Sequence, residues 1–266
     1  MNTDEQAVWG SEDVSSGKDA GDENFPVGSL LISHRLRPHV HAYYDFARVI
    51  DDIVDTDRLD AQQKIARLDA MEDVVLGKRS APDRRDAQTA VRVGRTLART
   101  GVSTTTATDL IVAFRQDAVK NRYDTWEELE EYCRYSANPV GRFLLELHGE
   151  DPKTFGASDA LCTALQVLNH LQDCADDLRD LDRCYLPRPW LEREGVTVDD
   201  LRRPYSAPGL RRVFAALLDR VDELNRHAAL LPRMIRDRRM RMEAAVIVGL
   251  SKRLAARLRV EDPVAG

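Results

Sequence analysis

Two groups of polar side chains, far apart in the sequence, have the spacing expected of a metal and phosphate site. In the first group, Tyr44, Arg48, Asp51 and Asp55 are separated by four, three and four residues. On an α-helix these positions fall within a stripe of about 60°, so the four side chains share one face. Paired carboxylates suit a hard cation such as Mg²⁺, which binds through one or two carboxylates together with substrate phosphate oxygens.

The second group is Gln166, Asn169, Asp173 and Asp177, on a helix that we expect to cover residues 158–181. The same geometry places them within about 80° of one another. The rest of this predicted helix is mostly apolar and includes Leu161, Leu165, Val167, Leu168, Leu171, Cys174, Ala175 and Leu178. A helix this apolar should be largely buried, and carboxylates beside it then need cations or hydrogen-bond donors.

Either stripe, taken alone, is equally well explained as the solvated face of a charged helix. However, two carboxylates one helical turn apart repel each other and destabilise a helix by a few tenths of a kcal/mol. Two such pairs beside apolar residues therefore indicate a purpose other than helix stability. We interpret them as ligands for a metal ion and a diphosphate.

The elements that must position these residues are all predicted to be helices. Helical periodicity dominates from Phe25 onward, and no run of alternating β-branched residues predicts a sheet. We therefore expect an all-α fold with one domain over residues 24–261, preceded by a disordered acidic tail over residues 1–23. A capping box at Thr125 predicts one helix start, and the other helices are expected at 38–55, 60–76, 86–100, 104–122, 158–181, 208–230 and 233–259.

Composition excludes some classes of function. The 266-residue chain has a net charge of −6, so it offers no surplus of positive charge to attract nucleic acid. Its longest apolar run near the C-terminus, 244–250, is far too short to cross a bilayer. We expect a cytoplasmic protein whose four cysteines are reduced packing groups, because their spacing matches no metal finger.

Four stretches of the sequence, in this order, resemble the squalene/phytoene synthase family. They are Glu-Asn-Phe-Pro-Val-Gly-Ser at 23–29, the aspartate-rich stretch at 43–55, Tyr-Cys-Arg-Tyr-Ser-Ala-Asn-Pro-Val-Gly at 132–141, and the second aspartate motif at 169–187. The resemblance covers about residues 18–260 and is most similar to the bacterial hydroxysqualene synthase branch of hopanoid biosynthesis. Each motif is weak alone, but four in the order of the family are specific.

This resemblance implies an α-helical isoprenoid synthase fold with a central active-site cavity, in which the two aspartate pairs lie on facing helices. It implies Mg²⁺ as cofactor, with the metal ligands Asp51, Asp55, Asn169, Asp173 and Asp177. The implied catalytic residues are Tyr44, Arg48, Tyr132 and Gln166. The implied substrate-binding residues are Phe25, Arg48, Asn138, Val140, Gly141, Arg183 and Tyr185.

The resemblance also implies a reaction. In the branch that matches best, presqualene diphosphate and water give hydroxysqualene and diphosphate without a nicotinamide cofactor. The expected partner is thus a prenyl diphosphate, with peripheral membrane contact and pathway enzymes as further partners, although no anchoring helix is evident in the sequence. Condensation of two farnesyl diphosphates to presqualene diphosphate, or a phytoene or squalene synthase activity, stays open. His170 and Gln172 within the second motif favour the water-adding enzyme.

Rival classes share parts of this pattern. Asp-Asp-Ile-Val-Asp at 51–55 also fits head-to-tail prenyltransferases and terpene cyclases, but the steps Asn169, Asp173 and Asp177 fit the second motif of neither. A di-iron helical protein would need a glutamate with a histidine three residues later, and the chain has none. A non-catalytic helical lipid-binding subunit is the remaining alternative, and it predicts no metal binding.

Overall fold

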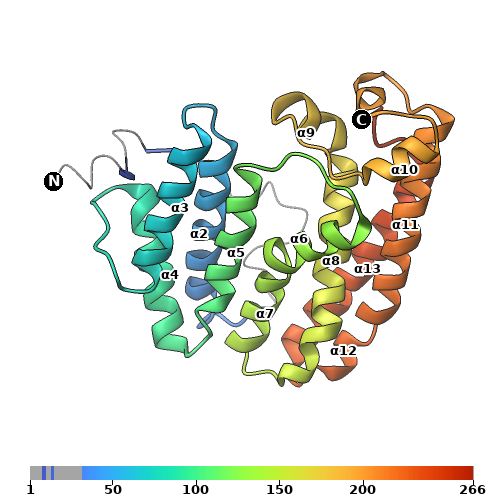
Figure 1. Cartoon of the computed structure of the whole chain (residues 1–266). Helices are drawn as coiled ribbons and strands as arrows, with labels where there is room; N and C mark the ends of the chain where they lie inside the picture. The colour runs from blue at the N-terminus through green and yellow to red at the C-terminus, as the bar shows by residue number, and fades with distance from the viewer. Residues whose placement is uncertain (1–7, 10–12, 15–31, 266) are drawn as a thin grey trace. The chain divides into compact units, whose positions relative to one another are not determined.

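The computed structural model describes residues 8–9, 13–14 and 32–265, and the regular elements in this part of the chain are helices (Figure 1). A single isolated bridge, between Arg122 and Cys184, is the only β-type pairing among them. The predicted all-α class is therefore confirmed. The predicted disordered tail, residues 1–23, lies mostly outside the described residues, and Phe25 lies outside them entirely.

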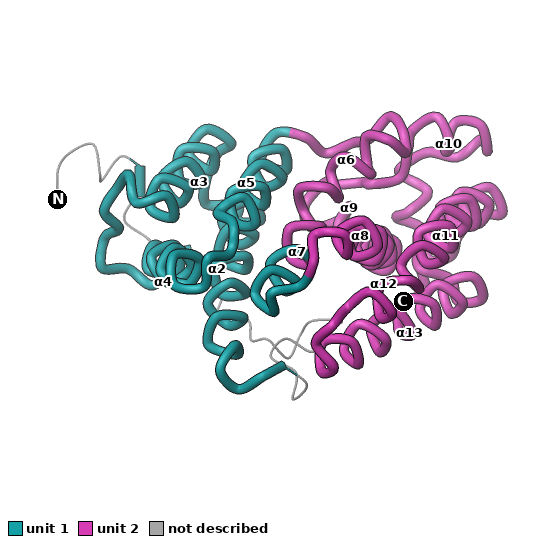
Figure 2. Tube along the Cα trace, turned by 90° about the horizontal axis from the view of Figure 1, so that it is seen from below, with its two compact units in different colours: residues 1–119, 142–150 teal, residues 120–141, 151–266 magenta. Residues whose placement is uncertain are grey.

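The chain divides into two compact units, shown in different colours in Figure 2. The first unit comprises residues 1–119 and 142–150, and the second comprises residues 120–141 and 151–266. The predicted single domain, 24–261, contains parts of both units, and that division of the chain into domains stays a prediction.

In the first unit, α2 packs against three other helices, and its apolar side supplies much of the core. These helices are α2 (Arg37–Asp55), α3 (Ala61–Val75), α4 (Arg85–Thr100) and α5 (Thr105–Asp117). Phe46, Ile50 and Ile53 of α2 are fully buried. Pro38 lies in the first turn of α2, where its missing N–H has no helical partner to lose. The polar stripe lies on the opposite face of α2.

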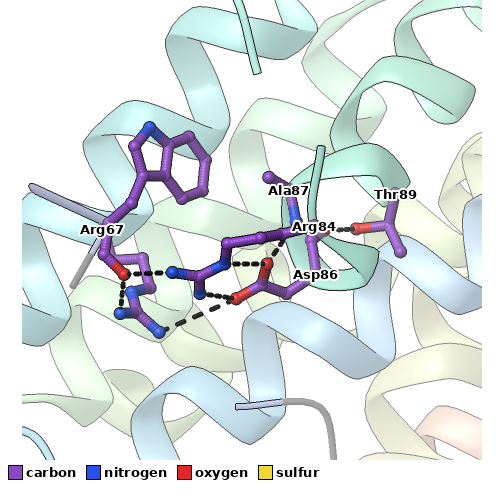
Figure 3. A network of polar contacts seen from close by, with 6 residues as sticks. Arg67, Arg84, Asp86, Ala87 and Thr89 are labelled. Carbon is purple, nitrogen blue, oxygen red and sulfur yellow. Dashed lines mark hydrogen bonds and ion pairs between the residues drawn. The ribbon is translucent and has the colours of Figure 1, made fainter. Parts of the chain in front are cut away.

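A buried charge network joins α3, the start of α4 and the described N-terminal residues of this unit (Figure 3). The Asp86 carboxylate receives hydrogen bonds from Arg84 (Nε to Oδ1, 3.1 Å) and from the Ala87 N–H (2.7 Å). Arg67 Nη1 lies 3.7 Å from its other oxygen, and both arginines also donate to the Trp9 carbonyl oxygen. Each buried charge in this network is thus paired within the chain.

In the second unit, α8 is the central helix and packs against α6, α11 and α13. Its helices are α6 (Trp126–Ser136), α8 (Phe155–Gln172), α9 (Cys174–Asp180), α10 (Arg188–Arg193), α11 (Pro208–Ala228), α12 (Leu231–Met234) and α13 (Arg238–Val260), with 3₁₀ turns at Pro152–Thr154 and Val198–Arg202. The chain passes from the second unit back to the first within α7 (Asn138–Leu147). The predicted burial of α8 is confirmed, because most of its residues are buried.

Three predicted helices differ from the observed ones. The helix predicted at 104–122 ends at Asp117, because the segment after it pairs with residues 184–188 instead. The helix predicted at 233–259 begins at Arg238, where Asp237 accepts hydrogen bonds from two backbone N–H groups and caps it. The single helix predicted at 158–181 is wrong, since it is interrupted at Asp173.

The four cysteines are free thiols, and three of them are buried, as predicted. Burial raises the pKa of the Cys174 thiol to about 12, so this group stays protonated. Within the described part of the chain, every helix is too short or too polar to span a membrane.

Candidate active site

The first polar stripe lies on one uninterrupted helix, as predicted. Tyr44, Arg48, Asp51 and Asp55 are all half-buried positions of α2, opposite its buried apolar side. Arg48 Nη1 lies 3.3 Å from Asp51 Oδ2, so the stripe contains one internal ion pair. Arg48 thus orients the Asp51 carboxylate. Asp55, one turn further along α2, places a second carboxylate on the same face.

The second stripe spans a break between two helices. Gln166 and Asn169 are half-buried on α8, whereas Asp173 separates α8 from α9 and Asp177 lies in the first turn of α9. The Asp173 backbone has φ −95° and ψ 4°, in the bridge region where many active-site residues occur. Hydrogen bonds from the Asp173 N–H to Asn169 O (2.9 Å) and from the Asp177 N–H to Asp173 O (2.7 Å) continue across the break.

The surroundings of Asp173 disfavour a negative charge. Desolvation by the protein raises the pKa of this carboxyl above its usual range, and the neighbouring charge of Asp176 adds to the effect, although the side chain keeps contact with solvent. Among the described residues, no side chain forms a hydrogen bond or ion pair with the Asp173 carboxylate. A cation from outside the chain would therefore stabilise it.

An aromatic cluster lies beside this stripe in the second unit. Tyr132 of α6 lies 5.7 Å, centroid to centroid, from Tyr185 and 5.6 Å from Tyr123. The ring of His170, on α8, stacks on Tyr185 with centroids 3.5 Å apart. Aromatic faces carry partial negative charge and can stabilise a cation without reacting with it. The predicted residues Tyr132 and Tyr185 are thus brought together.

Sequence reasoning missed Tyr123 and underrated His170. Tyr123 is held beside Tyr185 because Asn121 O accepts from the Cys184 N–H (2.9 Å) and Tyr123 O accepts from the Arg188 N–H (3.0 Å). This pairing of two non-helical segments leaves no periodic signal in the sequence. The only local indication was a tyrosine between two predicted helices.

His170 is buried and neutral. Burial lowers the pKa of its imidazole to about 3, and the charge of Arg183 contributes in the same direction. Its Nε2 atom has no hydrogen-bond partner among the described residues. His170 is therefore packed in the fold, with one polar atom unsatisfied among the described residues.

The predicted helix break at small residues is observed. α6 ends at Ser136 and Ala137 adopts φ −122° and ψ −45°, after which α7 begins. Asn138 is buried and its Oδ1 accepts a hydrogen bond from Thr163 Oγ1 at 3.1 Å. A Cβ atom on Gly141 would lie 2.4 Å from Ser158 Oγ, so packing against α8 already requires this glycine.

The substrate-binding roles of these residues stay predictions. The same holds for Val140, which is half-buried, and for Arg183, which is buried. The two aspartate pairs belong to different units, so the expectation that they face each other across a cavity also stays a prediction. Among the described residues, no three acidic, histidine or cysteine side chains form a group that could hold a metal by themselves.

Comparison with known proteins agrees with this arrangement. Residues 18–264 match the squalene/phytoene synthase family. The chain is 42% identical to a hydroxysqualene synthase of Rhodopseudomonas palustris over 255 residues, which covers 96% of this chain and 85% of the relative. It is 40% identical to a hydroxysqualene synthase of Zymomonas mobilis, covering 94% of this chain and 83% of that one.

Solved structures give the same result. The squalene synthase HpnC from Alicyclobacillus acidocaldarius is 36% identical, with a TM-score of 0.76 over 89% of this chain and 88% of that one. A dehydrosqualene synthase, 22% identical, has a TM-score of 0.69 over 87% of this chain and 90% of that one, which supports the fold alone. The matched family extends through both compact units and all three described motifs, and the chain therefore belongs to the squalene/phytoene synthase family.

Proposed function

We propose that this squalene-synthase-type enzyme converts presqualene diphosphate and water to hydroxysqualene and diphosphate. The observation that carries the proposal is the similarity to hydroxysqualene synthases, which is 38–42% identity over more than nine-tenths of the chain. Phytoene synthases, by contrast, match at 27–32% identity over shorter stretches. Phytoene or presqualene diphosphate synthesis is therefore the lesser candidate.

The proposed reaction needs two environments. The bond between carbon and the diphosphate oxygen breaks, and the electron pair leaves with diphosphate. The remaining cyclopropylcarbinyl cation rearranges, a water oxygen bonds to carbon, and one proton is released. The leaving group requires positive charge, whereas the cation requires an apolar site with aromatic faces.

The aromatic cluster supports the second environment. Tyr123 stacks on Tyr185, whereas Tyr132 lies edge-on to Tyr123 and tilted to Tyr185, and all three rings are buried in the second unit. His170, being neutral, adds no positive charge that would repel a carbocation. We assign cation stabilisation to Tyr132 and Tyr44, and orientation of the leaving diphosphate to Arg48 and Arg183. We assign Gln166, half-buried on α8 one turn before His170, to the same proposed active site.

We also propose Mg²⁺ as the cofactor. Its ligands in this proposal are Asp51, Asp55, Asn169, Asp173 and Asp177, an oxygen donor set that suits a hard cation. The Asp173 carboxylate has no partner among the described residues and lies in surroundings that raise its pKa, which supports a cation at this position. Bound Mg²⁺ would neutralise charge developing on the leaving diphosphate.

Hopanoid biosynthesis, a cytoplasmic location and a lyase-type classification belong to the same proposal. All three rest on the sequence and on its resemblance to the family.

The test is product identification. Purified enzyme with Mg²⁺ should convert presqualene diphosphate to pyrophosphate and a hydroxylated C30 alcohol in the absence of NADPH, as measured by mass spectrometry. In parallel, farnesyl diphosphate alone should give no presqualene diphosphate. Formation of squalene only when NADPH is present, or efficient condensation of farnesyl diphosphate, would overturn the proposal.

A further inference from the structure

The outward side of α13 carries a row of exposed apolar side chains. Met242, Val246 and Leu250 are 57%, 51% and 42% exposed. They are four residues apart, so they form a continuous stripe about 80° wide along the helix. The buried side of the same helix contains Ala244 and Val248 and faces α8 and α11. The stripe is therefore not part of the core of its unit.

Basic side chains surround this stripe. The helix has seven arginines and lysines but a single acidic residue, Glu243, in a chain whose net charge is −6. Arg238, Arg239, Lys252 and Arg253 are exposed, and none of them forms an ion pair with another described residue. This face of α13 thus combines exposed apolar groups with uncompensated positive charge.

The combination limits what the face could bind. A purely apolar partner would leave the cations desolvated and unpaired, which is costly. A purely anionic partner would leave Met242, Val246 and Leu250 without apolar contact. An anionic lipid surface satisfies both, because arginine and lysine reach headgroup phosphates while their stems and the apolar side chains contact acyl chains.

We propose that the exposed face of α13 is a docking surface for an anionic lipid membrane. The proposal does not depend on which reaction the enzyme catalyses, because it rests on the exposure and charge of this helix alone. It assigns the face to shallow peripheral binding, in which the helix lies parallel to the membrane plane. A second copy of the chain is the rival occupant.

The first test measures binding of the full-length protein to vesicles. We expect co-sedimentation with vesicles containing phosphatidylglycerol and at least tenfold weaker binding to vesicles of pure phosphatidylcholine. Raising the salt concentration should release the protein, because screening weakens attraction between exposed charges. Equal binding to both vesicles, or none to either, would overturn the proposal.

The second test uses paired variants. Met242→Gln with Val246→Gln and Leu250→Gln removes the apolar stripe, and Lys252→Gln with Arg253→Gln removes two cations. Each set should weaken binding to phosphatidylglycerol vesicles about tenfold or more, with circular dichroism showing an unchanged helix content.

Matched controls come from exposed positions of the first unit. Val112→Gln with Val119→Gln, and Arg95→Gln with Arg99→Gln, remove the same types of group from α4, α5 and the residues after α5. These controls should bind as the unmodified protein does. Loss of binding in the controls to the same extent, or a stripe variant that binds normally but changes from dimer to monomer in light scattering, would overturn the proposal.

Discussion

Asp86 in the first unit and Asp173 in the second are carboxylates that the fold treats in opposite ways. Asp86 is fully buried, yet it receives hydrogen bonds from Arg84 and from a backbone N–H, with Arg67 close by (Figure 3). The Asp173 side chain keeps contact with solvent, its carboxylate has no hydrogen-bond or ion-pair partner among the described residues, and its surroundings raise its pKa.

This difference separates a structural charge from one available to a ligand. A buried carboxylate that serves the fold needs its cation within the same chain, because an unpaired buried charge costs several kcal/mol. A carboxylate without an internal cation, by contrast, is available to a cation from outside the chain. Asp86 therefore belongs to the stability of the first unit, and Asp173 to the proposed metal site.

The largest expected effect is on activity at Asp173. Asp173→Asn should reduce kcat/KM at least about 10³-fold, since it removes a ligand to the charge that stabilises the leaving diphosphate. The melting temperature should be unchanged or slightly higher, because the carboxylate gains nothing from its surroundings in the free protein. Steady-state kinetics and thermal denaturation measure both.

Asp180→Asn is the matched control for this substitution. Asp180 lies in the last turn of α9 and pairs with Arg179 at 2.8 Å on the exposed side of the helix. Its substitution should leave kcat/KM within a few fold. If Asp180→Asn were as inactive as Asp173→Asn, the site would not be specific to the predicted stripe.

The opposite pattern is expected at Asp86. Asp86→Asn should lower the free energy of unfolding by about 3–5 kcal/mol, because Arg84 and Arg67, which is only 2% exposed, each lose a carboxylate that neutralises them. The folded fraction should keep its activity. Urea denaturation with Asp73→Asn as control tests this, since the half-exposed Asp73 pair with Arg79 should contribute less than about 1 kcal/mol. Equal losses in both variants would remove the distinction.

Ligand binding should also distinguish the two carboxylates. Mg²⁺ with inorganic pyrophosphate should raise the melting temperature of the unmodified protein and of Asp86→Asn, but not that of Asp173→Asn. A ligand at 100 times its Kd adds about 2.7 kcal/mol to folding stability, which is easily measured by thermal shift. An equal shift in the Asp173 variant would contradict its assignment as a ligand.

The sequence predicted the first polar stripe, on α2, better than the second, which is interrupted at Asp173. The stripe on α2 could be predicted because the helix is continuous from Arg37 to Asp55, so spacing alone sets the face. The break at Asp173 could not, because hydrogen bonds continue across it and the sequence there has no proline or glycine. Pairing that depends on contacts distant in sequence, such as Arg67 with Asp86, likewise gives no local signal.

The exposed face of α13 was also missed, for a related reason. Its apolar residues alternate with buried ones, so the sequence resembles an ordinary core helix with basic side chains. Only the burial of each position shows that Met242 and Val246 point away from the core.

His170 differs from both carboxylates, because this buried ionisable group is uncharged in the folded protein. Its folded-state pKa of about 3 lies below the ordinary value of 6.5, so the unfolded chain binds a proton more readily. The stability contribution is complete above about pH 6.5 and is lost as pH falls toward 3. Lowering the pH from 7 to 5 should therefore reduce the free energy of unfolding by about 2 kcal/mol through this group.

The variant His170→Phe tests this smallest effect, because it keeps an aromatic ring against Tyr185 but cannot bind a proton. Urea denaturation at pH 7 and pH 5 should show a smaller loss of stability for the variant than for the unmodified protein. His41→Phe, the same replacement at an exposed position of α2, is the matched control. If His170→Phe lost as much stability as the unmodified protein between these pH values, the histidine would be protonated in the fold, and a positive charge would then stand beside the aromatic cluster.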